Sequence, residues 1–247
     1  MSKSILEMDK KELLILRAES VSHQLTANEV IHIATALGAF WKYDYAAARQ
    51  GQVGKHALLK SGFHSDGFFV SKILLEPENI RHIMSYQIVI KLGIENVVVP
   101  DYVAGIPYGA TALGSNVAKI IGVYEAYMSK INDRIVLDTK IPSGATLLLV
   151  EDFCTRGTGF REAVLQIKNT QPFVKILLYN PVIINRGGLK EIFVEGAGNF
   201  SVIPVVEQRI KGWNPIERCP LCDIGSVAIK PKITDENWRL LTTSQLK

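Results

Sequence analysis

The sequence lacks several features that mark membrane, secreted and nucleic-acid-binding proteins. Its first residues contain no apolar stretch of the roughly 7–15 residues that a signal peptide needs. Nowhere do about 18 apolar residues run together, as a membrane span requires. Lys and Arg do not cluster among aromatic residues, and the formal net charge is only +4 over 247 residues. We therefore expect a cytoplasmic protein with small phosphorylated substrates, binding neither a membrane nor nucleic acid.

Cysteine is scarce, because Cys154, Cys219 and Cys222 are the only three, an odd number and a poor disulfide framework. The Cys219-Pro-Leu-Cys222 segment has the spacing of half a zinc site. A structural zinc normally has four ligands, yet no second Cys pair exists and the last histidine is His82. We therefore predict a tight C-terminal turn with two reduced thiols and no protein-bound metal, with a metal on the two thiols as the alternative.

Composition and length indicate an ordinary globular protein with a sizeable core, because 47% of the residues are hydrophobic and 21% are charged. Residues 1–50 are charged and weakly amphipathic. Within them, Thr26-Ala27-Asn28-Glu29 has the pattern of a capping box for a helix whose apolar positions continue to Trp41. We expect an N-terminal helical extension that packs on the core or on a second subunit, and an amphipathic cover is favoured.

The stretch from Thr146 to Gly159 combines a buried strand, two carboxylates and a turn of small residues. The uniform apolar run of residues 146–150 suits the middle of a parallel sheet, and Glu151 and Asp152 follow it directly. The Thr- and Gly-rich turn then leads into a helical pattern. Its amides and the helix N-terminus favour an anion such as phosphate, while the carboxylates can accept hydrogen bonds from two sugar hydroxyls. The alternative is a solvated strand end.

This stretch resembles the phosphoribosyl pyrophosphate (PRPP) signature of the type I phosphoribosyltransferases, in which a strand, two acidic residues and a Thr- and Gly-rich phosphate loop follow one another. Glu151 and Asp152 match the acidic pair. The matched loop positions are Thr155, Gly157 and Thr158. The sequence departs from the signature at Phe153 and Cys154, where smaller or aliphatic residues are usual, and at Arg156, where the nearest relatives carry Ala.

A second segment, residues 56–72, resembles the N-terminal motif of the orotate phosphoribosyltransferases, a Leu-Lys-Ser-Gly sequence followed by Ser-Pro-Tyr-Phe-Phe. On this resemblance Lys60 lies at the base or pyrophosphate site, and Phe68 and Phe69 wall the pyrimidine pocket. Ser65-Asp66-Gly67 replaces Ser-Pro-Tyr, which predicts a different pocket rim. Adjacent strand residues point to opposite faces, so one of the two Phe rings is expected to be free for a flat ligand.

Residues 77–121 predict a helix from Pro77 to Leu92, a strand at Glu95–Pro100, and then a Gly-bearing loop and a helix to Ile121. Within the loop, Gly105-Ile106-Pro107 matches a family segment at which backbone amides approach the pyrophosphate. The family usually carries a Lys just before this triplet. Ala104 stands there instead, so one cationic contact to the phosphates is lost.

The connection at residues 129–142 corresponds to a mobile lid in the orotate enzymes, rich in Arg, Lys, His and Gly, which reaches into a neighbouring subunit's site. This chain offers Lys130, Arg134 and Lys140 but not the lid sequence. Lys130 or Arg134 can substitute for the lid cations, or the segment is a β-hairpin flanked by solvated charges. The hairpin is favoured.

Arg186 follows the next strand and stands where relatives of the orotate enzyme have an Arg that holds the carboxylate of the base. A guanidinium is the natural bidentate partner of such a group. Taken alone, an Arg in a turn is more often solvent exposed.

The resemblance covers about residues 56–230 and implies an α/β fold, a mostly parallel twisted sheet flanked by helices, with a small hood and an N-terminal helical extension. The expected division is an extension over residues 1–50, a phosphoribosyltransferase-like domain with its hood over residues 51–230, and a tail over residues 231–247.

The implied reaction transfers ribose 5-phosphate from PRPP to a nucleobase, with orotate favoured, and yields orotidine 5'-monophosphate and pyrophosphate in pyrimidine biosynthesis. Mg²⁺ bound mainly through PRPP is the implied cofactor, and a homodimer is the implied assembly. The implied catalytic residues are Glu151, Asp152, Lys130 and Arg134. The implied substrate-binding residues are Lys60, Phe68, Phe69, Gly105, Thr155, Arg156, Gly157, Thr158, Gly159 and Arg186.

Two alternatives stay open. One is a PRPP-binding regulatory protein that has lost catalysis, which Ala104 and the missing lid sequence favour. Against it, residues 1–50 show neither a basic recognition helix nor a clear helix-turn-helix. The other alternative is a phosphoribosyltransferase for a different base.

Overall fold

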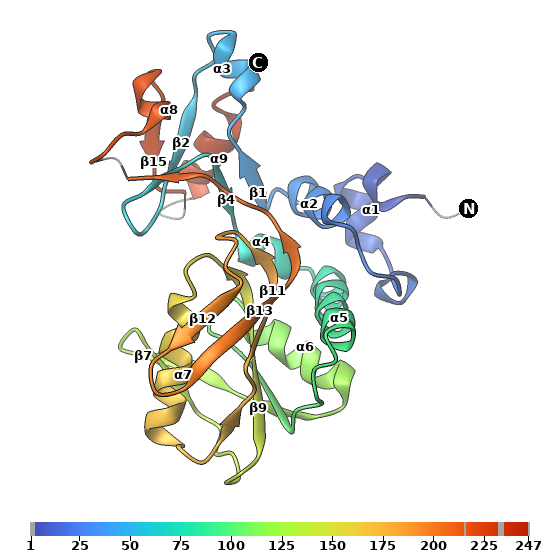
Figure 1. The fold of residues 1–247 in the computed structure, drawn as a ribbon. Helices are drawn as coiled ribbons and strands as arrows, with labels where there is room; N and C mark the ends of the chain where they lie inside the picture. Colours follow the sequence, from blue (N-terminus) through green and yellow to red (C-terminus); the bar gives the residue numbers. More distant parts are fainter. Residues whose placement is uncertain (1–2, 215, 232–234, 247) are drawn as a thin grey trace. The chain divides into compact units, whose positions relative to one another are not determined.

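The computed structural model describes residues 3–214, 216–231 and 235–246. These residues form two compact units, the first from residues 3–36 and 71–209 and the second from residues 37–70 and 210–246 (Figure 1). The division differs from the expected one, because residues 37–50 and the C-terminal segment join the region around Lys60 in one unit. Residues 232–234 and 247 of the expected tail lie outside the described residues.

The first unit contains an α/β sheet with flanking helices, as expected. Its strands are β5 (Tyr102–Gly105), β6 (Tyr124–Ala126), β7 (Met128–Ile131), β8 (Arg134–Leu137), β9 (Thr146–Cys154), β10 (Lys175–Ile176), β11 (Tyr179–Asn185), β12 (Glu191–Val194) and β13 (Gly198–Glu207). Its helices are η1 (Ile5–Glu7), α1 (Lys10–Ile15), η2 (Ala18–Ser20), α2 (Ala27–Ala36), α4 (Ser71–Leu75), α5 (Glu78–Ile94), α6 (Thr111–Ile121) and α7 (Thr158–Thr170).

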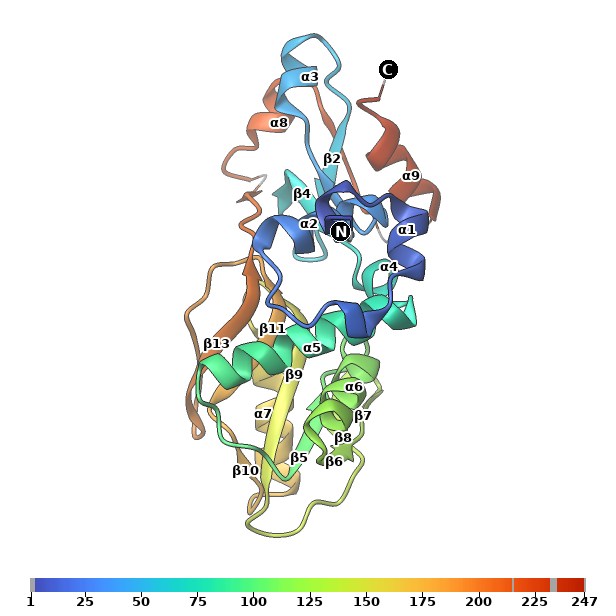
Figure 2. The same ribbon diagram turned by 90° about the vertical axis from the view of Figure 1, so that its right-hand side faces the viewer.

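The sheet order is β12-β13-β11-β9-β5-β6, and every pair except β12–β13 is parallel. The chain runs from β5 outward to β6, returns across the sheet to β9, and then continues in the other direction through β11 to β13. The order therefore reverses between β5 and β9. Helices α5 and α6 lie on one face of the sheet and α7 on the other (Figures 1 and 2). A doubly wound sheet binds its ligand at the carboxyl strand ends beside such a reversal.

A long apolar core fixes the register of the central strands. Residues 147–150 of β9 have no exposed surface, as the uniform apolar run predicts for a strand covered on both faces. Below this strand, Phe160 and Ala163 of α7 are fully buried in the same core, and Phe160 meets Phe200 edge to face with ring centroids 5.1 Å apart. Helix α7 is thereby held against the sheet, and its N-terminus lies at the end of β9.

Two expected elements are placed differently. No strand forms at residues 95–100, where Val98 and Val99 are 64% and 70% exposed. The strand begins instead at Tyr102, which pairs with Leu147. The preceding residue, Asp101, accepts hydrogen bonds of 2.7 Å from the amide and the hydroxyl of Thr146. Trp41 does not belong to the helix that follows the Thr26 capping box, although the sequence predicted that it would. This helix, α2, ends at Ala36, and Trp41 lies in a strand of the second unit.

The N-terminal segment covers the core of the first unit, as the favoured prediction has it. The capping box is present, because Thr26 N donates to Glu29 Oε2 at 2.8 Å and Glu29 N donates to Thr26 Oγ1 at 3.3 Å. From α5, the Asn79 side chain donates to the carbonyls of Leu13 and Leu16 at 2.9 Å. Within the part of the chain that is described, no helix is long and apolar enough to cross a membrane.

The second unit is a small sheet with short helices. Its elements are β1 (Phe40–Lys42), α3 (Tyr45–Arg49), β2 (Lys55–Leu58), β3 (His64–Ser65), β4 (Gly67–Phe69), β14 (Gly212–Trp213), α8 (Pro220–Asp223), β15 (Val227–Ile229) and α9 (Asp235–Thr243). One sheet has the order β14-β3-β2-β15, and β1 pairs with β4. Both edge strands of the larger sheet thus come from the C-terminal segment. The two segments, distant in sequence, share one core around Trp41, Leu221 and Leu241.

Asp66 joins the two segments of this unit. Its side chain is 3% exposed and accepts hydrogen bonds from the Tyr45 hydroxyl at 3.0 Å and the Lys211 amide at 2.9 Å. Its own amide donates to the Lys211 carbonyl at 3.3 Å. The Ser65-Asp66-Gly67 departure from the family motif therefore has a structural role within this unit.

Replacement of Asp66 by Ala should lower the free energy of unfolding of the second unit by about 2–3 kcal/mol, because two part-buried donors, the Tyr45 hydroxyl and the Lys211 amide, lose their acceptor. Tyr45→Phe removes one of these hydrogen bonds and should cost only about 1 kcal/mol. All three tryptophans, Trp41, Trp213 and Trp238, belong to this unit, so urea unfolding followed by tryptophan fluorescence measures its stability selectively. Equal midpoints for Asp66→Ala and wild type would contradict this role.

Candidate active site

The acidic pair lies at the carboxyl end of β9, beside the reversal of strand order. Two loops leave the sheet here, the one after β5 beginning at Gly105 and the one after β9 beginning at Thr155. They lead to α6 and α7, which lie on opposite faces (Figure 2). The expected order of strand, acidic pair, loop and helix is confirmed, and the second βα loop lies beside it as the sequence predicted.

Asp152 contacts the loop after β5. Its carboxylate lies so close to Gly109 that a Cβ atom at this position would overlap with Oδ2. The other oxygen, Oδ1, accepts a hydrogen bond of 2.7 Å from the Phe153 amide. Asp152 remains partly exposed, so it can reach a ligand at the loop. A glycine at position 109 is needed to let the loop approach the carboxylate. Within this loop the peptide bond between Pro107 and Tyr108 is cis.

Glu151 is buried, with 8% of its surface exposed. Its Oε2 accepts a hydrogen bond of 2.8 Å from the Asn180 side chain on β11, and a Cβ at Gly159 would lie 3.6 Å from Oε1. Burial raises the pKa of Glu151 to about 7, and the neighbouring Asp152 charge adds to this, while Asn180 and Arg186 oppose it. Glu151 therefore exchanges its proton near neutral pH, unlike an ordinary surface carboxyl.

The loop after β9 presents exposed polar groups at the start of α7. Thr155, Arg156 and Thr158 are exposed. Gly157 has φ +65°, which favours glycine, and a side chain there would meet Ile192. The N-cap residue Gly157 has no side chain to cap the first turn of α7, so the first amides of this helix lack the usual N-cap acceptor and can bind an anion. Arg161 stabilises the loop by donating to the Arg156 carbonyl at 2.6 Å.

Arg186 lies beside the acidic pair and the phosphate loop. Its amide donates to the Cys154 carbonyl at 2.7 Å, and its guanidinium carbon lies 5.4 Å from the Phe153 ring centroid. Burial lowers the pKa of Arg186, while the negative charge of Asp152 raises it. Its Nε is buried and has no hydrogen-bond partner among the described residues. Arg186 thus lies near the acidic pair, and both its role in the site and its contact with a base carboxylate stay predictions.

The lid segment is a β-hairpin, as the favoured prediction has it. Strands β7 and β8 pair from Met128↔Leu137 to Ile131↔Arg134, and the turn residues Asn132 and Asp133 have φ of 50° and 61°, which is typical of a two-residue hairpin turn. Helix α7 holds the hairpin, because the amides of Ile135 and Leu137 donate to Glu162 and Gln166 at 2.9 and 3.0 Å.

The two candidate cations of the hairpin are placed differently. The Lys130 Nζ lies 5.9 Å from the centroid of the Tyr108 ring, and the Tyr108 hydroxyl donates to the Lys130 carbonyl at 3.3 Å. Lys130 therefore lies next to the loop after β5. Arg134 is exposed at the start of β8. The structure thus connects Lys130 to the site more directly than Arg134.

Three of the residues expected to bind the base, Lys60, Phe68 and Phe69, belong to the second unit, whereas Arg186 belongs to the first. Lys60 is exposed in the turn between β2 and β3. Phe68 and Phe69 point to opposite faces, as predicted, but Phe69 is 1% exposed and stacks on Phe40 with ring centroids 4.0 Å apart. The expectation that Phe69 walls an open pocket is therefore wrong, because β1 covers its ring. Phe68 is partly exposed, with its ring centroid 6.0 Å from that of Trp238.

Sequence reasoning missed two residues of the site, Asn180 and Gly109. Asn180 is fully buried in the otherwise apolar β11, and its Oδ1 has no hydrogen-bond partner among the described residues. An amide in a strand covered on both faces was the available signal, since a buried polar group requires a partner. Gly109 gave no comparable signal, because only the fold brings it to Asp152.

The free energy of unfolding should reveal the raised pKa of Glu151. Below pH 4.5 the Glu151 carboxyl is neutral in both the folded and the unfolded state. As pH rises from 4.5 through about 7, the folded state loses the free-energy advantage that it has while this carboxyl is protonated. The free energy of unfolding of Glu151→Gln, measured relative to wild type, should therefore be higher at pH 8 than at pH 4.5, by up to about 3 kcal/mol. Chemical unfolding followed by circular dichroism at both pH values measures this gain. The exposed Glu19→Gln is the control, and an equal gain in both variants would contradict the assignment.

No family model matches the chain. Curated proteins are similar to the chain in sequence. One of them is the orotate phosphoribosyltransferase of Caldanaerobacter subterraneus subsp. tengcongensis, which is 27% identical over 180 residues. The match covers 71% of this chain and 87% of the relative. The orotate phosphoribosyltransferase of Acidithiobacillus ferrooxidans is 26% identical over 217 residues, or 84% and 97% of the two chains.

Two solved structures share the fold. Orotate phosphoribosyltransferase from Aeropyrum pernix has a TM-score of 0.52 at 17% identity and covers 72% of this chain and 93% of its own. UMP synthase from Leishmania donovani has a TM-score of 0.57 at 16% identity, and the match spans 88% of this chain and 42% of that longer one. In sequence the chain is similar to orotate phosphoribosyltransferases, and its fold is that of type I phosphoribosyltransferases, with the acidic pair at the end of β9 in this fold.

Proposed function

We propose that this chain is a phosphoribosyltransferase that transfers ribose 5-phosphate from PRPP to a nucleobase, with orotate as the base. One observation carries the proposal. The carboxylates of Asp152 and Glu151 lie at the carboxyl end of β9, where Gly109 of the loop after β5 adjoins Asp152 and Gly159 in the first turn of α7 adjoins Glu151. A sugar with phosphates on both sides needs this combination of hydroxyl acceptors between two anion-binding loops.

The ribose and its 5-phosphate would bind between β9 and α7. The partly exposed Asp152 would accept hydrogen bonds from the ribose hydroxyls, and Glu151 would add negative charge behind it. The 5-phosphate would be held by the hydroxyls and amides of Thr155, Gly157 and Thr158 at the uncapped start of α7. Cleavage of the bond to pyrophosphate makes the sugar resemble an oxocarbenium ion, so carboxylates fixed beside it stabilise the transition state electrostatically.

The pyrophosphate would lie at the loop that begins at Gly105. Backbone amides of this loop and Lys130 beside Tyr108 are the groups available to it. The oxygen donors of the acidic pair fit Mg²⁺, which prefers carboxylate and phosphate oxygens. Mg²⁺ bound mainly through PRPP, with Asp152 as its protein neighbour, would offset charge on the leaving pyrophosphate.

Two observations support orotate as the base. The relatives that are similar in sequence are named orotate phosphoribosyltransferases, and the chain contains the Lys60-Ser61-Gly62 segment. Two observations favour the regulatory alternative. Ala104 is fully buried in the core and offers no cation, and the hairpin is held on α7 by two hydrogen bonds. A homodimer stays a prediction, which light scattering of the purified chain tests.

Asp152→Asn should lower the rate of PRPP turnover by roughly 10²-fold, because the variant keeps the shape of the side chain but loses the charge beside the developing cation. Pyrophosphate release with Mg²⁺ measures the rate. Asp9→Asn is the matched control, since it removes the same charge at an exposed helix cap that Asn also satisfies. Unchanged turnover in Asp152→Asn would contradict the role of the acidic pair.

The base is tested by pyrophosphate release from PRPP with orotate, uracil, adenine and hypoxanthine in parallel. Release with orotate alone is the expected result. Release with a purine would replace orotate and keep the reaction. Tight PRPP binding by calorimetry without release from any base would overturn catalysis and favour the regulatory protein.

A further inference from the structure

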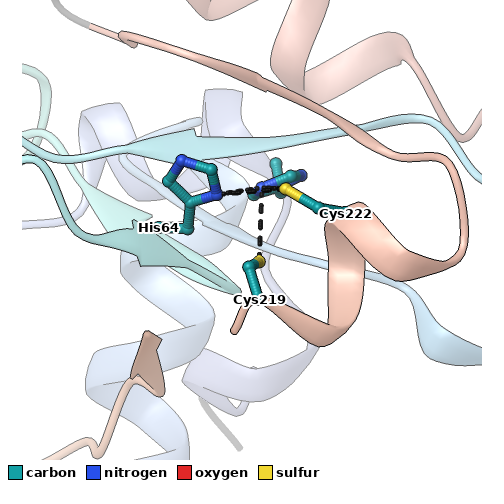
Figure 3. A group of neighbouring side chains, drawn as sticks. His64, Cys219 and Cys222 are labelled. Carbon is teal, nitrogen blue, oxygen red and sulfur yellow. Dashed lines mark hydrogen bonds between the residues drawn. The ribbon is translucent and has the colours of Figure 1, made fainter. Parts of the chain in front are cut away.

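Four metal-binding side chains converge in the second unit, at a place that plays no part in the proposed reaction. They are His56 and His64 from the first segment of the unit and Cys219 and Cys222 from the second, and Figure 3 shows His64 and both thiols turned toward one point. One ligand atom from each residue lies within 4.8 Å of all the others. We propose that these four side chains bind one Zn²⁺ ion, which links the two segments of the unit.

The distances between the ligand atoms fit a tetrahedral ion. Zinc bond lengths of about 2.3 Å to sulfur and about 2.05 Å to nitrogen place tetrahedral ligands about 3.4 Å apart for two nitrogens and about 3.6 Å apart for nitrogen and sulfur. In the structure, His56 Nε2 lies 3.0 Å from His64 Nδ1 and 3.7 Å from each sulfur, and Cys222 Sγ lies 3.3 Å from His64 Nδ1. These four of the six ligand pairs are each within about 0.4 Å of the tetrahedral value, and the two remaining pairs, Cys219 with Cys222 and Cys219 with His64, lie within 4.8 Å.

The backbone directs all four side chains to this point. Strands β2 and β3 pair with Ala57 opposite Ser65 and Leu58 opposite His64, which puts His56 and His64 on the same face as diagonal neighbours. Cys219 precedes α8, with Pro220 at its first position, and Cys222 follows within the single turn of this helix. A Cys-x-x-Cys turn facing two histidines on a hairpin gives a Cys₂His₂ ligand set.

The hydrogen bonds around His56 leave its Nε2 free for a metal. Ser226 Oγ donates to the Gly54 carbonyl at 3.1 Å, and His56 Nδ1 lies 2.9 Å from the same Oγ. When the Ser226 hydroxyl gives its one hydrogen to Gly54, His56 Nδ1 donates to the hydroxyl oxygen, and Nε2 carries the lone pair that faces the thiols. Zinc-bound histidines usually have their second nitrogen fixed in this way by a polar group.

The donor set favours zinc over the other candidates. Two thiolates and two imidazoles in a tetrahedron suit Zn²⁺, whereas Mg²⁺ and Ca²⁺ require oxygen ligands. A Rieske-type cluster also uses two Cys and two His, but it binds them in separate pairs on two irons. Here Cys222 Sγ lies within 3.7 Å of both histidine nitrogens, so a single ion fits the four ligands.

The ion would stabilise the unit by joining segments that are far apart in sequence, since His56 and Cys219 are separated by 163 positions. The apolar core of this unit is small, and small cores commonly depend on a metal for stability. The sequence argument, which looked for a second Cys pair and a histidine after His82, missed the site because its other two ligands precede the Cys pair by more than 150 positions.

The direct test is the zinc content of the full chain, purified without chelators, by inductively coupled plasma mass spectrometry. One zinc per chain is expected, and Co²⁺ in its place should give the visible absorption of a tetrahedral site with thiolate charge-transfer bands. Wild-type protein that holds neither zinc nor Co²⁺, or that carries a Cys219–Cys222 disulfide after purification under reducing conditions, would overturn the proposal.

Variants assign the ligands. Cys222→Ser and His64→Ala should lose most of the zinc, and the tryptophan-fluorescence unfolding midpoint should fall on treatment with a chelator only in proteins that hold zinc. His64→Cys should retain zinc and strengthen the thiolate–Co²⁺ bands, a result that does not depend on a variant's failure to fold. Cys154→Ala and His23→Ala, outside the cluster, are the matched controls and should keep one zinc per chain. Unaltered zinc content in Cys222→Ser would overturn the assignment.

Discussion

The burial of the Glu151 carboxylate beside the partly exposed Asp152 at the end of β9 is the constraint on which the first unit depends. Glu151 lies where water stabilises its charge poorly, so Asn180 and Arg186 must offset that charge from the neighbouring strand. Asp152 needs a loop that approaches without a side chain, which Gly109 provides. A solvated strand end, the alternative that the sequence left open, would need none of these neighbours. The cost of assembling them indicates that the pair is kept for a ligand.

Features set by neighbouring residues could be predicted from the sequence, and features set by distant pairing could not. The acidic pair at the end of a strand, the Thr- and Gly-rich loop leading into a helix, and the hairpin at residues 128–137 follow from local patterns, and all three are present as structural elements. The valines at residues 97–99 have the local pattern of a strand but lie outside the sheet. The start of β5 is decided by the bonds between Asp101 and Thr146, 45 positions away, and no local pattern reports them.

The second unit shows the same limit more strongly. Strand alternation predicts that Phe68 and Phe69 point to opposite faces, but it does not say what covers each face. Phe40 from an earlier strand covers Phe69, and Trp238 from the C-terminal segment lies near Phe68. The convergence of His56 and His64 with the Cys pair has the same origin, because the pairing of β2 with β15 and of β3 with β14 brings the two segments together.

The loss of the Lys at position 104 and the loss of the lid sequence are best understood together. Ala104 is fully buried between Leu149 and Ala126, its partners on the adjacent strands, so core packing occupies the place where the family carries a cation. Lys130 lies instead beside the loop after β5, on a hairpin that α7 holds in place. A charge fixed in this way needs no reorganisation during the reaction, but it excludes less water than a closing lid. Under the proposed function, a cation on this hairpin would take the place of a mobile cover, so that pyrophosphate would still be attracted while the sugar would be more exposed to solvent.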